Sequence, residues 1–290
     1  MLLKKKLTVF DVCNYLLLTV LCVVTLYPIV YVIMASISDP LLLEVHDGLL
    51  LWPQGFSLDA YEMVISDSRI ITGYRNTIMY VVLGTSINMF MTSLGAFVLS
   101  RKTLYIRKFL MIAIIITMQF GGGLIPTYLV VSGILGTSIW TQVIPGAIAA
   151  MNLIILRTGF ESIPDSLIES AKIDGANDLH ILLKITLPLS KAVLAVIALY
   201  YGVEHWNQWL KATIYLRSRD FYPLQVFLRE ILIESSVEET MLSVATTYVA
   251  DMTDVIKYAS IMVSIIPVLC VYPFIQKFFV KGVMAGAVKG

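Results

Sequence analysis

The residues that could do chemistry in this chain are concentrated between Glu169 and Pro188. These 20 residues hold three carboxylates, two lysines and one histidine, in a chain of 290 residues that is 58% hydrophobic and 14% charged. Such groups could ligate a metal, move protons or contact a charged partner. The histidines His46, His180 and His205 fall in three separate segments and no H-E-x-x-H pattern is present, so a zinc enzyme is not indicated. Two interpretations of the stretch are left: a solvated loop, or an element that docks on a partner.

The composition predicts an integral membrane protein. Soluble chains carry about 25% charged residues, whereas this one has a mean hydropathy of +0.83. About 20 apolar residues cross a bilayer. We therefore predict an all-α membrane protein of one domain, residues 1–290, with six spans near 12–36, 76–100, 109–131, 138–156, 191–211 and 258–276. The three cysteines, Cys13, Cys22 and Cys270, lie in apolar runs, and no disulfide framework is expected.

The distribution of basic residues predicts the orientation. With the N-terminus inside, the inner segments hold 14 of the 21 lysines and arginines, which fits the excess of positive charge on cytoplasmic loops. Both termini and the segment 160–190 are then cytoplasmic, in the plasma membrane of a bacterium. The large loops 37–74 and 212–257 face outside. The net charge of +1 without a basic cluster does not indicate a nucleic-acid partner.

The polar stretch has the periodicity of a short helix pair. Pro164 suits the first turn of a helix, and Gly175 supplies the backbone freedom that a helix end requires. Glu169 and Lys172 are spaced closely enough to interact on the polar face. The first helix is predicted to have one apolar face, formed by Leu167, Ile168 and Ala171.

A second helix is predicted after Gly175. Asn177 or Asp178 could cap it, and it is expected to stop before Pro188, because the residue before a proline disfavours the helical conformation. The pair would lie at the inner membrane surface with its charges facing away from the lipid.

The specific residues resemble a known signature. Glu169-Ser-Ala-x-x-Asp174-Gly175-Ala176, followed by Ile185-x-Leu187-Pro188, resembles the "EAA" signature of ABC-importer permeases, with Ser170 where alanine is usual. In such proteins this segment docks into a cleft of a cytoplasmic ATPase. The resemblance thus implies an ATPase-coupling role for Glu169, Ser170, Ala171, Asp174, Gly175, Ala176, Leu187 and Pro188.

The resemblance extends over nearly the whole chain. Asn76-Thr, Gly95-Ala-Phe-x-Leu-Ser-Arg101, Leu124-Ile-Pro-Thr-Tyr128 and the ending from Phe279 to Gly290 resemble permeases of the carbohydrate-uptake type-1 (maltose-type) family. Gly121-Gly-Gly, Asp174-Gly-Ala-Asn-Asp-Leu and Tyr222-Pro-Leu-Gln are most similar to its LplC/YtcP-like group. This implies a type I importer permease fold and the import of oligosaccharides or polysaccharide fragments.

The family also implies partners. They are a second homologous permease, an ABC ATPase dimer and an extracytoplasmic solute-binding protein, which the loop 212–257 is expected to meet. No G-x-x-x-x-G-K-[ST] pattern occurs in the chain. We therefore expect no cofactor on this chain, no catalytic residue and no metal, with ATP and magnesium on the partner ATPase.

A second polar group lies at the outer end of the predicted fifth span. Glu204 follows Lys191 by thirteen residues, which is about 20 Å along a helix. An ionisable residue at that depth usually faces a bundle interior or a wet cavity. Aromatic faces beside amide and carboxylate groups would suit a sugar, whereas the alternative is an interfacial aromatic belt. The candidate pathway residues are Tyr200, Glu204, Trp206, Asn207 and Gln208.

Two questions stay open. Gly121-Gly-Gly with Pro126 could form a gating bend, although close helix packing is the favoured interpretation. A secondary transporter of a small polar solute is the main alternative function, and no paired ion-site pattern or inverted repeat supports it. An intramembrane hydrolase would need a nucleophile with a base, and Glu204 alone does not meet that requirement.

Overall fold

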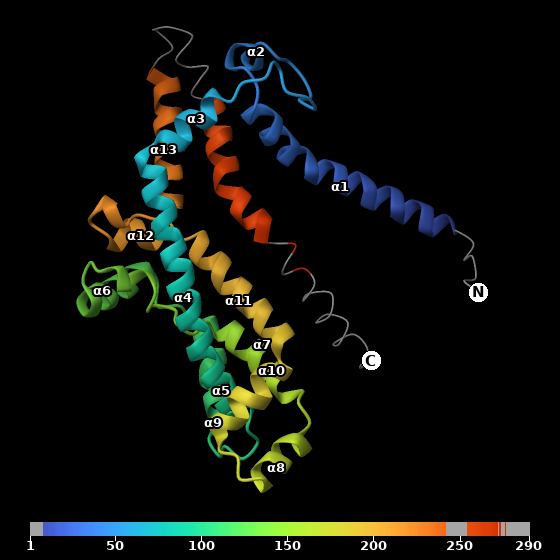
Figure 1. The fold of residues 1–290 in the computed structure, drawn as a ribbon, viewed down its shortest axis with the longest axis vertical. Coiled ribbons are helices and arrows are strands. Elements are labelled where there is room, and N and C mark those ends of the chain that lie inside the picture. Colours follow the sequence, from blue (N-terminus) through green and yellow to red (C-terminus); the bar gives the residue numbers. More distant parts are fainter. Residues whose placement is uncertain (1–7, 242–253, 272, 274–275, 277–290) are drawn as a thin grey trace. The chain divides into compact units, whose positions relative to one another are not determined.

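The computed structural model describes residues 8–241, 254–271, 273 and 276, and Figure 1 shows that this part of the chain is built from helices, turns and loops. The longer helices are α1 (Val9–Ser36), α3 (Asp59–Ser66), α4 (Ser68–Ser100), α5 (Arg107–Gln119), α6 (Leu124–Leu135), α7 (Ala150–Glu161), α8 (Asp165–Ile173), α11 (Lys191–Trp206) and α13 (Leu224–Met241). The shorter ones are α2 (Pro40–Glu44), α9 (Asp178–His180), α10 (Leu187–Leu189), α12 (Leu210–Tyr215) and the turns η1 (Ile139–Gln142), η2 (Ile181–Thr186) and η3 (Arg219–Phe221).

Three helices are long and apolar enough to cross a membrane. They are α1, α4 and the helix Asp254–Val271. Two bent pairs also qualify if each counts as one span: α5 with α6, bent by 115°, and Asp178–Leu189 with α11, bent by 86°. The described residues therefore hold three to five candidate spans. The predicted termini at 1–7 and the ending from Phe279 lie outside the described residues.

The bend between α5 and α6 is made by the glycines. Gly123 has a φ of +79°, and a Cβ placed at Gly121 would meet nothing within 4 Å. Among the described residues, close packing of another helix is therefore not observed at Gly121, and the atoms nearest to a Cβ at Gly122 and Gly123 belong to Thr127 and Pro126 of α6. The glycines supply a backbone turn that residues with a Cβ disfavour, so residues 109–131 do not form one straight helix.

The chain forms two compact units, Met1–Ile70 with Leu228–Ile266, and Ile71–Phe227 with Pro267–Gly290. In the first unit, the end of α1 is fixed to α3 and to the loop between α2 and α3. Ser36 Oγ lies 2.8 Å from the Tyr61 hydroxyl, and Ser38 Oγ accepts a hydrogen bond from the Gln54 backbone nitrogen at 3.0 Å.

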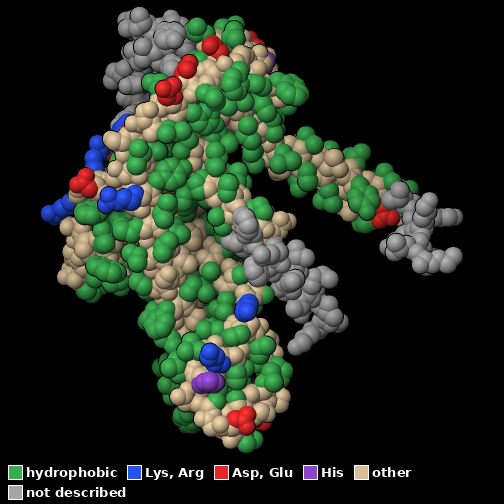
Figure 2. All heavy atoms as spheres, viewed as in Figure 1, with side chains coloured by type: hydrophobic (Ala, Val, Ile, Leu, Met, Phe, Trp, Pro, Cys, Tyr) green, Lys and Arg blue, Asp and Glu red, His purple; other side chains and the backbone are tan. Residues whose placement is uncertain are grey.

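The second unit carries the polar segments of interest. Its apolar core joins α4, α7, η2 and α11, and the buried members are Ala96, Phe97, Leu99, Leu153, Leu156, Phe160, Ile181, Leu182, Ile197 and Tyr201. α8 and α9 lie at one end of this unit (Figure 1), where Figure 2 shows acidic, basic and histidine side chains next to a mostly hydrophobic surface.

The unit also brings two distant sequence motifs together. Asn76 in α4 donates to the backbone oxygens of Asp220 at 2.7 Å and Tyr222 at 3.0 Å. Thr77 Oγ1 accepts from the Leu224 backbone nitrogen at 2.8 Å. Asn76-Thr and Tyr222-Pro-Leu-Gln, noted above as separate motifs, are therefore one structural contact.

Candidate functional site

The segment 160–190 is a helix–turn–helix closed by a left-handed turn. Gly175 has a φ of +81°. Its backbone nitrogen donates to the Lys172 oxygen at 3.1 Å, and the Ala176 nitrogen donates to the Ala171 oxygen at 2.9 Å. This pair of bonds is the Schellman motif, in which a glycine satisfies the last carbonyls of a helix. The predicted backbone role of Gly175 is confirmed.

Asn177 caps the second helix. Its side-chain oxygen accepts from the His180 backbone nitrogen at 2.8 Å, which satisfies a donor left free at a helix start. Of the two predicted caps, Asn177 and Asp178, the structure selects the first.

The second helix does not stop before Pro188, so that prediction is wrong. Helical backbone continues through α9, the π-helical turn η2 and α10, which contains Pro188 near its start. Proline is tolerated in a first helical turn, and the wider π turn changes the hydrogen-bond register just before it. The bend of 86° comes later, at Ser190, between α10 and α11.

The eight predicted coupling residues divide between two faces. Ala171, Ala176 and Leu187 pack against the apolar core. The other five are exposed and are Glu169, Ser170, Asp174, Gly175 and Pro188. A hollow of about 470 Å³ lies beside the turn and is lined by Ala171, Asp174, Gly175, Ala176, Asn177, His180 and Ile185. The exposed face offers a carboxylate, backbone polar groups and a concave surface to a partner.

The predicted interaction between Glu169 and Lys172 is not formed. Lys172 Nζ instead lies 3.9 Å from Asp178 Oδ1, across the turn. Glu169 has no ion pair among the described residues, because its one candidate partner on α8 reaches toward the second helix. Its carboxylate is available to another molecule.

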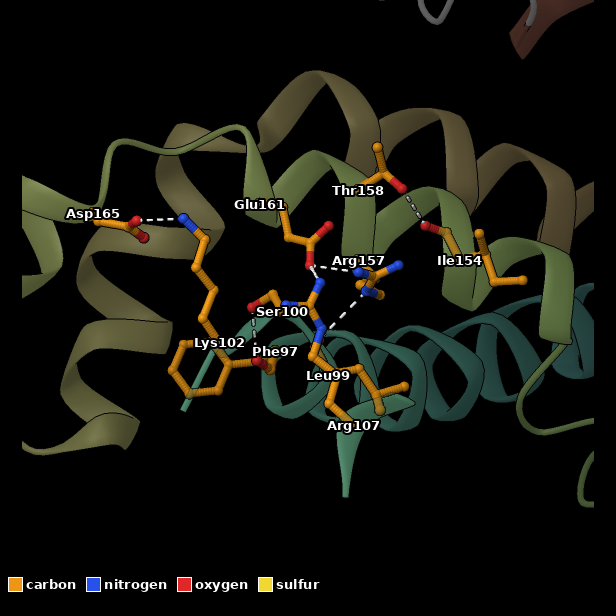
Figure 3. Close-up of polar contacts among 10 residues, drawn as sticks. All are labelled: Phe97, Leu99, Ser100, Lys102, Arg107, Ile154, Arg157, Thr158, Glu161 and Asp165. Atoms are coloured by element: carbon orange, nitrogen blue, oxygen red, sulfur yellow. Dashed lines mark hydrogen bonds and ion pairs between the residues drawn. The ribbon is translucent and has the colours of Figure 1, made fainter. Parts of the chain in front are cut away.

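An ion-pair cluster, shown in Figure 3, connects this segment to the helices that precede it. Arg107 at the start of α5 and Arg157 in α7 both bind Oε1 of Glu161, the latter at 2.6 Å. Arg157 Nε also donates to the Leu99 backbone oxygen of α4, at 3.3 Å. We call Arg107, Arg157 and Glu161 the Glu161 cluster. It joins the ends of three helices just before α8 begins.

A second, exposed ion pair fixes the first residue of α8. Lys102 Nζ lies 2.6 Å from Asp165 Oδ2. The hydrogen bond with Asp165 raises the pKa of the Lys102 ammonium above its usual value. The pairs Lys102–Asp165 and Arg107–Glu161 could not be predicted from the sequence, because their partners are more than fifty positions apart.

The five candidate pathway residues are separated by the structure. Tyr200 and Glu204 of α11 and Asn207, the residue that follows the helix, are exposed, whereas Gln208 is buried. Trp206 lies edge-on against Tyr74 at 6.2 Å between ring centres. It also lines an apolar cavity of about 650 Å³ that includes residues of α4 and α11. The helix ends at Trp206, short of the predicted 211.

The opposite face of α11 carries a buried ladder of hydrogen bonds to α4. His205 Nε2 lies 3.0 Å from Asn88 Oδ1, and the Tyr201 hydroxyl lies 2.7 Å from Thr92 Oγ1. Both pairs also contact the irregular segment 143–149. Asn88 Nδ2 donates to the Gly146 backbone oxygen at 2.9 Å, and the Tyr201 hydroxyl accepts from the Ala149 backbone nitrogen at 3.0 Å.

This ladder explains why the predicted fourth span, 138–156, is not one helix. Its α-helical part begins only at Ala150. Non-helical backbone at membrane depth must have its polar groups satisfied by protein, and Asn88 and Tyr201 do so. The sequence signal for such a ladder is the presence of polar residues one turn apart in two apolar helices, Asn88 and Thr92 in α4 and Tyr201 and His205 in α11.

Among the described residues, no three histidine, cysteine or acidic side chains come together as a metal site. His46 belongs to the first unit, and His180 and His205 lie on separate elements of the second.

Comparison with known proteins adds the following. The family model "Binding-protein-dependent transport system inner membrane component" matches residues 70–285. The polygalacturonan/rhamnogalacturonan transport system permease YtcP of Bacillus subtilis is 44% identical over 97% of this chain and 98% of its own length. LplC of the same organism is 38% identical over 97% of this chain and 95% of its own length.

A solved structure is also similar. It is a bacterial ABC transporter involved in the import of the acidic polysaccharide alginate, with a TM-score of 0.83 and 34% identity, covering 93% of this chain and 96% of the other.

Proposed function

The chain belongs to the binding-protein-dependent transport system inner membrane component family, as a permease subunit of an ABC importer rather than an enzyme, and we propose that it imports acidic oligosaccharides or polysaccharide fragments. The sugar-importer assignment follows the relatives, which transport oligosaccharides and polysaccharides. The acidic character of the proposed sugar is supported by two similar proteins. They are YtcP, a permease for polygalacturonan/rhamnogalacturonan, and the solved transporter involved in the import of alginate.

The observation that carries the coupling role is the exposed turn at Gly175. Its backbone motif presents Glu169, Asp174 and Gly175 away from the core. A carboxylate without an ion pair on that face suits a basic residue of a partner. We infer that this segment docks on a separate ATPase, which holds ATP and magnesium.

The proposed assembly contains a second, homologous permease, two ATPase subunits and an extracytoplasmic solute-binding protein. The chain would cross the bacterial plasma membrane six times with both termini inside. The excess of basic residues in the inner segments supports this orientation. The bent pairs and the helix that starts at Ala150 would supply the spans beyond the three long helices.

The test is uptake by the purified complex in proteoliposomes. Trigalacturonate and maltotriose are supplied with the solute-binding protein outside, with and without ATP inside. The proposal expects uptake of trigalacturonate that requires both ATP and the binding protein. Uptake without ATP, driven by an ion gradient, would contradict it and favour a secondary transporter.

A further inference from the structure

The break after α11 places an ammonium group opposite a carboxylate on an exposed face of the chain. Lys211 Nζ lies 3.5 Å from Glu204 Oε1, and their side chains are 37% and 53% exposed. No other acidic partner of Lys211 occurs among the described residues. An ion pair this exposed contributes little to stability. Stability therefore does not account for two charged residues next to hydrophobic spans.

The backbone of Lys211 is held by a buried side chain, whereas its ammonium group contacts only the exposed Glu204 among the described acidic residues. The Lys211 backbone oxygen accepts from Gln142 Nε2 at 3.4 Å. The Gln142 Oε1 in turn accepts from Gln208 Nε2 at 2.7 Å, and both glutamines are buried. This buried amide pair fixes the start of α12, so the position from which the lysine side chain extends is defined before any ligand binds.

Gly146 keeps space beside the ammonium group. It has a φ of +89°, and a Cβ there would lie 3.8 Å from Lys211 Nζ. Any larger side chain would crowd the amine. Because the Gly146 oxygen is bound by Asn88, this stretch of backbone is also fixed in place.

An aromatic pair lies one turn along the same helix. Tyr215 follows Lys211 by four positions in α12, so the two share a face. The Tyr215 ring stacks on Tyr128 of α6, at 5.5 Å between centres and an angle of 23°, and Tyr128 is exposed. Aromatic side chains beside a few placed polar groups are typical of small-molecule sites.

We propose that Lys211 binds a carboxylate of the transported sugar and that Glu204 occupies the lysine when no sugar is present. This assignment rests on the proposed function, because it requires acidic sugars to pass along this face. The sugar carboxylate takes the place of the Glu204 carboxylate on the ammonium group, and the displaced Glu204 side chain, 53% exposed, stays charged on the exposed face. A neutral sugar offers no such replacement and leaves the Glu204–Lys211 pair closed, which produces selectivity for acidic sugars.

The experiment uses the complete importer in proteoliposomes, with the solute-binding protein loaded with trigalacturonate. Lys211→Gln removes the charge, and Lys211→Arg retains it. Glu204→Lys combined with Lys211→Glu keeps an ion pair but reverses it. We expect Lys211→Gln and the reversed pair to lower the uptake rate about tenfold, the factor for losing one charge-assisted hydrogen bond. Lys211→Arg should retain most of the uptake, and all complexes should copurify with the ATPase.

Two results would overturn the inference. One is wild-type uptake by Lys211→Gln, and the other is uptake restored by the reversed pair, since that would make the ion pair structural. Failure of the proposed function is distinguishable from both. In that case the wild-type complex itself would take up no trigalacturonate, whichever residue stands at 211, and the inference would fall with it.

Discussion

Arg107 and Glu161, fifty-four positions apart, form an ion pair that joins the first residue of α5 to the last residue of α7. Arg157 binds the same carboxylate oxygen. The three side chains of this Glu161 cluster are only 16–24% exposed. One carboxylate thus neutralises part of two partly buried guanidinium charges immediately before the segment proposed to contact the ATPase.

The first prediction concerns this cluster. Glu161→Gln leaves two guanidinium groups close together with no counter-charge, and removing one partner of a buried pair costs about 3–5 kcal/mol. Partial exposure should reduce this to about 2 kcal/mol. Thermal unfolding of the purified permease complex measures the loss.

Asp165→Asn is the matched control for that prediction. It breaks the Lys102–Asp165 pair, whose side chains are 70% and 59% exposed. Exposed pairs contribute about 0–1 kcal/mol, so the unfolding midpoint should change little. Equal losses for Glu161→Gln and Asp165→Asn would show that burial of the Glu161 cluster has no energetic effect.

The second prediction concerns the approach of α4 to α11. A Cβ on Gly84 would collide with the imidazole ring of His205, at Nε2, Cε1 and Cδ2. Gly84→Ala must therefore displace His205 and break its contact with Asn88, and overpacking of this kind costs about 1–3 kcal/mol.

Gly133→Ala in α6 is its control, because a Cβ there meets nothing within 4 Å. Alanine in a helix is favoured over glycine by about 1 kcal/mol. Gly133→Ala should be neutral or stabilising in the same unfolding assay. A neutral Gly84→Ala would mean that α4 and α11 do not approach this closely.

The third prediction separates the two functions of Tyr201. Its hydroxyl contacts Thr92 and also accepts from the Ala149 backbone nitrogen. Tyr201→Phe leaves that buried donor unpaired, which costs about 1–3 kcal/mol. Thr92→Val removes only the other contact, so it should cost less. The order of unfolding midpoints tests this, and a larger loss for Thr92→Val would contradict it.

The sequence predicted local features well where one stretch of chain determines them. The left-handed turn at Gly175 and the cap at Asn177 depend on neighbouring residues, and both are present. The all-helical character and the long apolar helices α1 and α4 follow from composition and run length. The order of motifs also sufficed to identify the family.

The sequence did not predict features that depend on distant partners. The break before Ala150 is possible because Asn88 and Tyr201 bind its backbone, and run length carries no information about that. Glu169 and Lys172 are correctly spaced for a pair, but Asp178 across the turn takes the lysine. Gln208 was grouped with Glu204 by proximity in sequence, whereas it lies in the break between α11 and α12 and is buried against Gln142.

The central claim is that the turn at Gly175 couples this permease to its ATPase, and one paired measurement tests it most directly. Gly175→Arg and Gly175→Asn are expressed with the partner subunits, and copurified ATPase and ATP-driven uptake are measured together. A Cβ at Gly175 meets nothing within 4 Å, so neither variant disturbs packing. Asparagine tolerates the left-handed conformation, whereas arginine is strained there and adds positive charge to the docking face.

Gly175→Asn should therefore retain the ATPase and most of the uptake. Gly175→Arg should reach the membrane but copurify with little ATPase and drive little uptake. Wild-type copurification and uptake by Gly175→Arg would contradict the account.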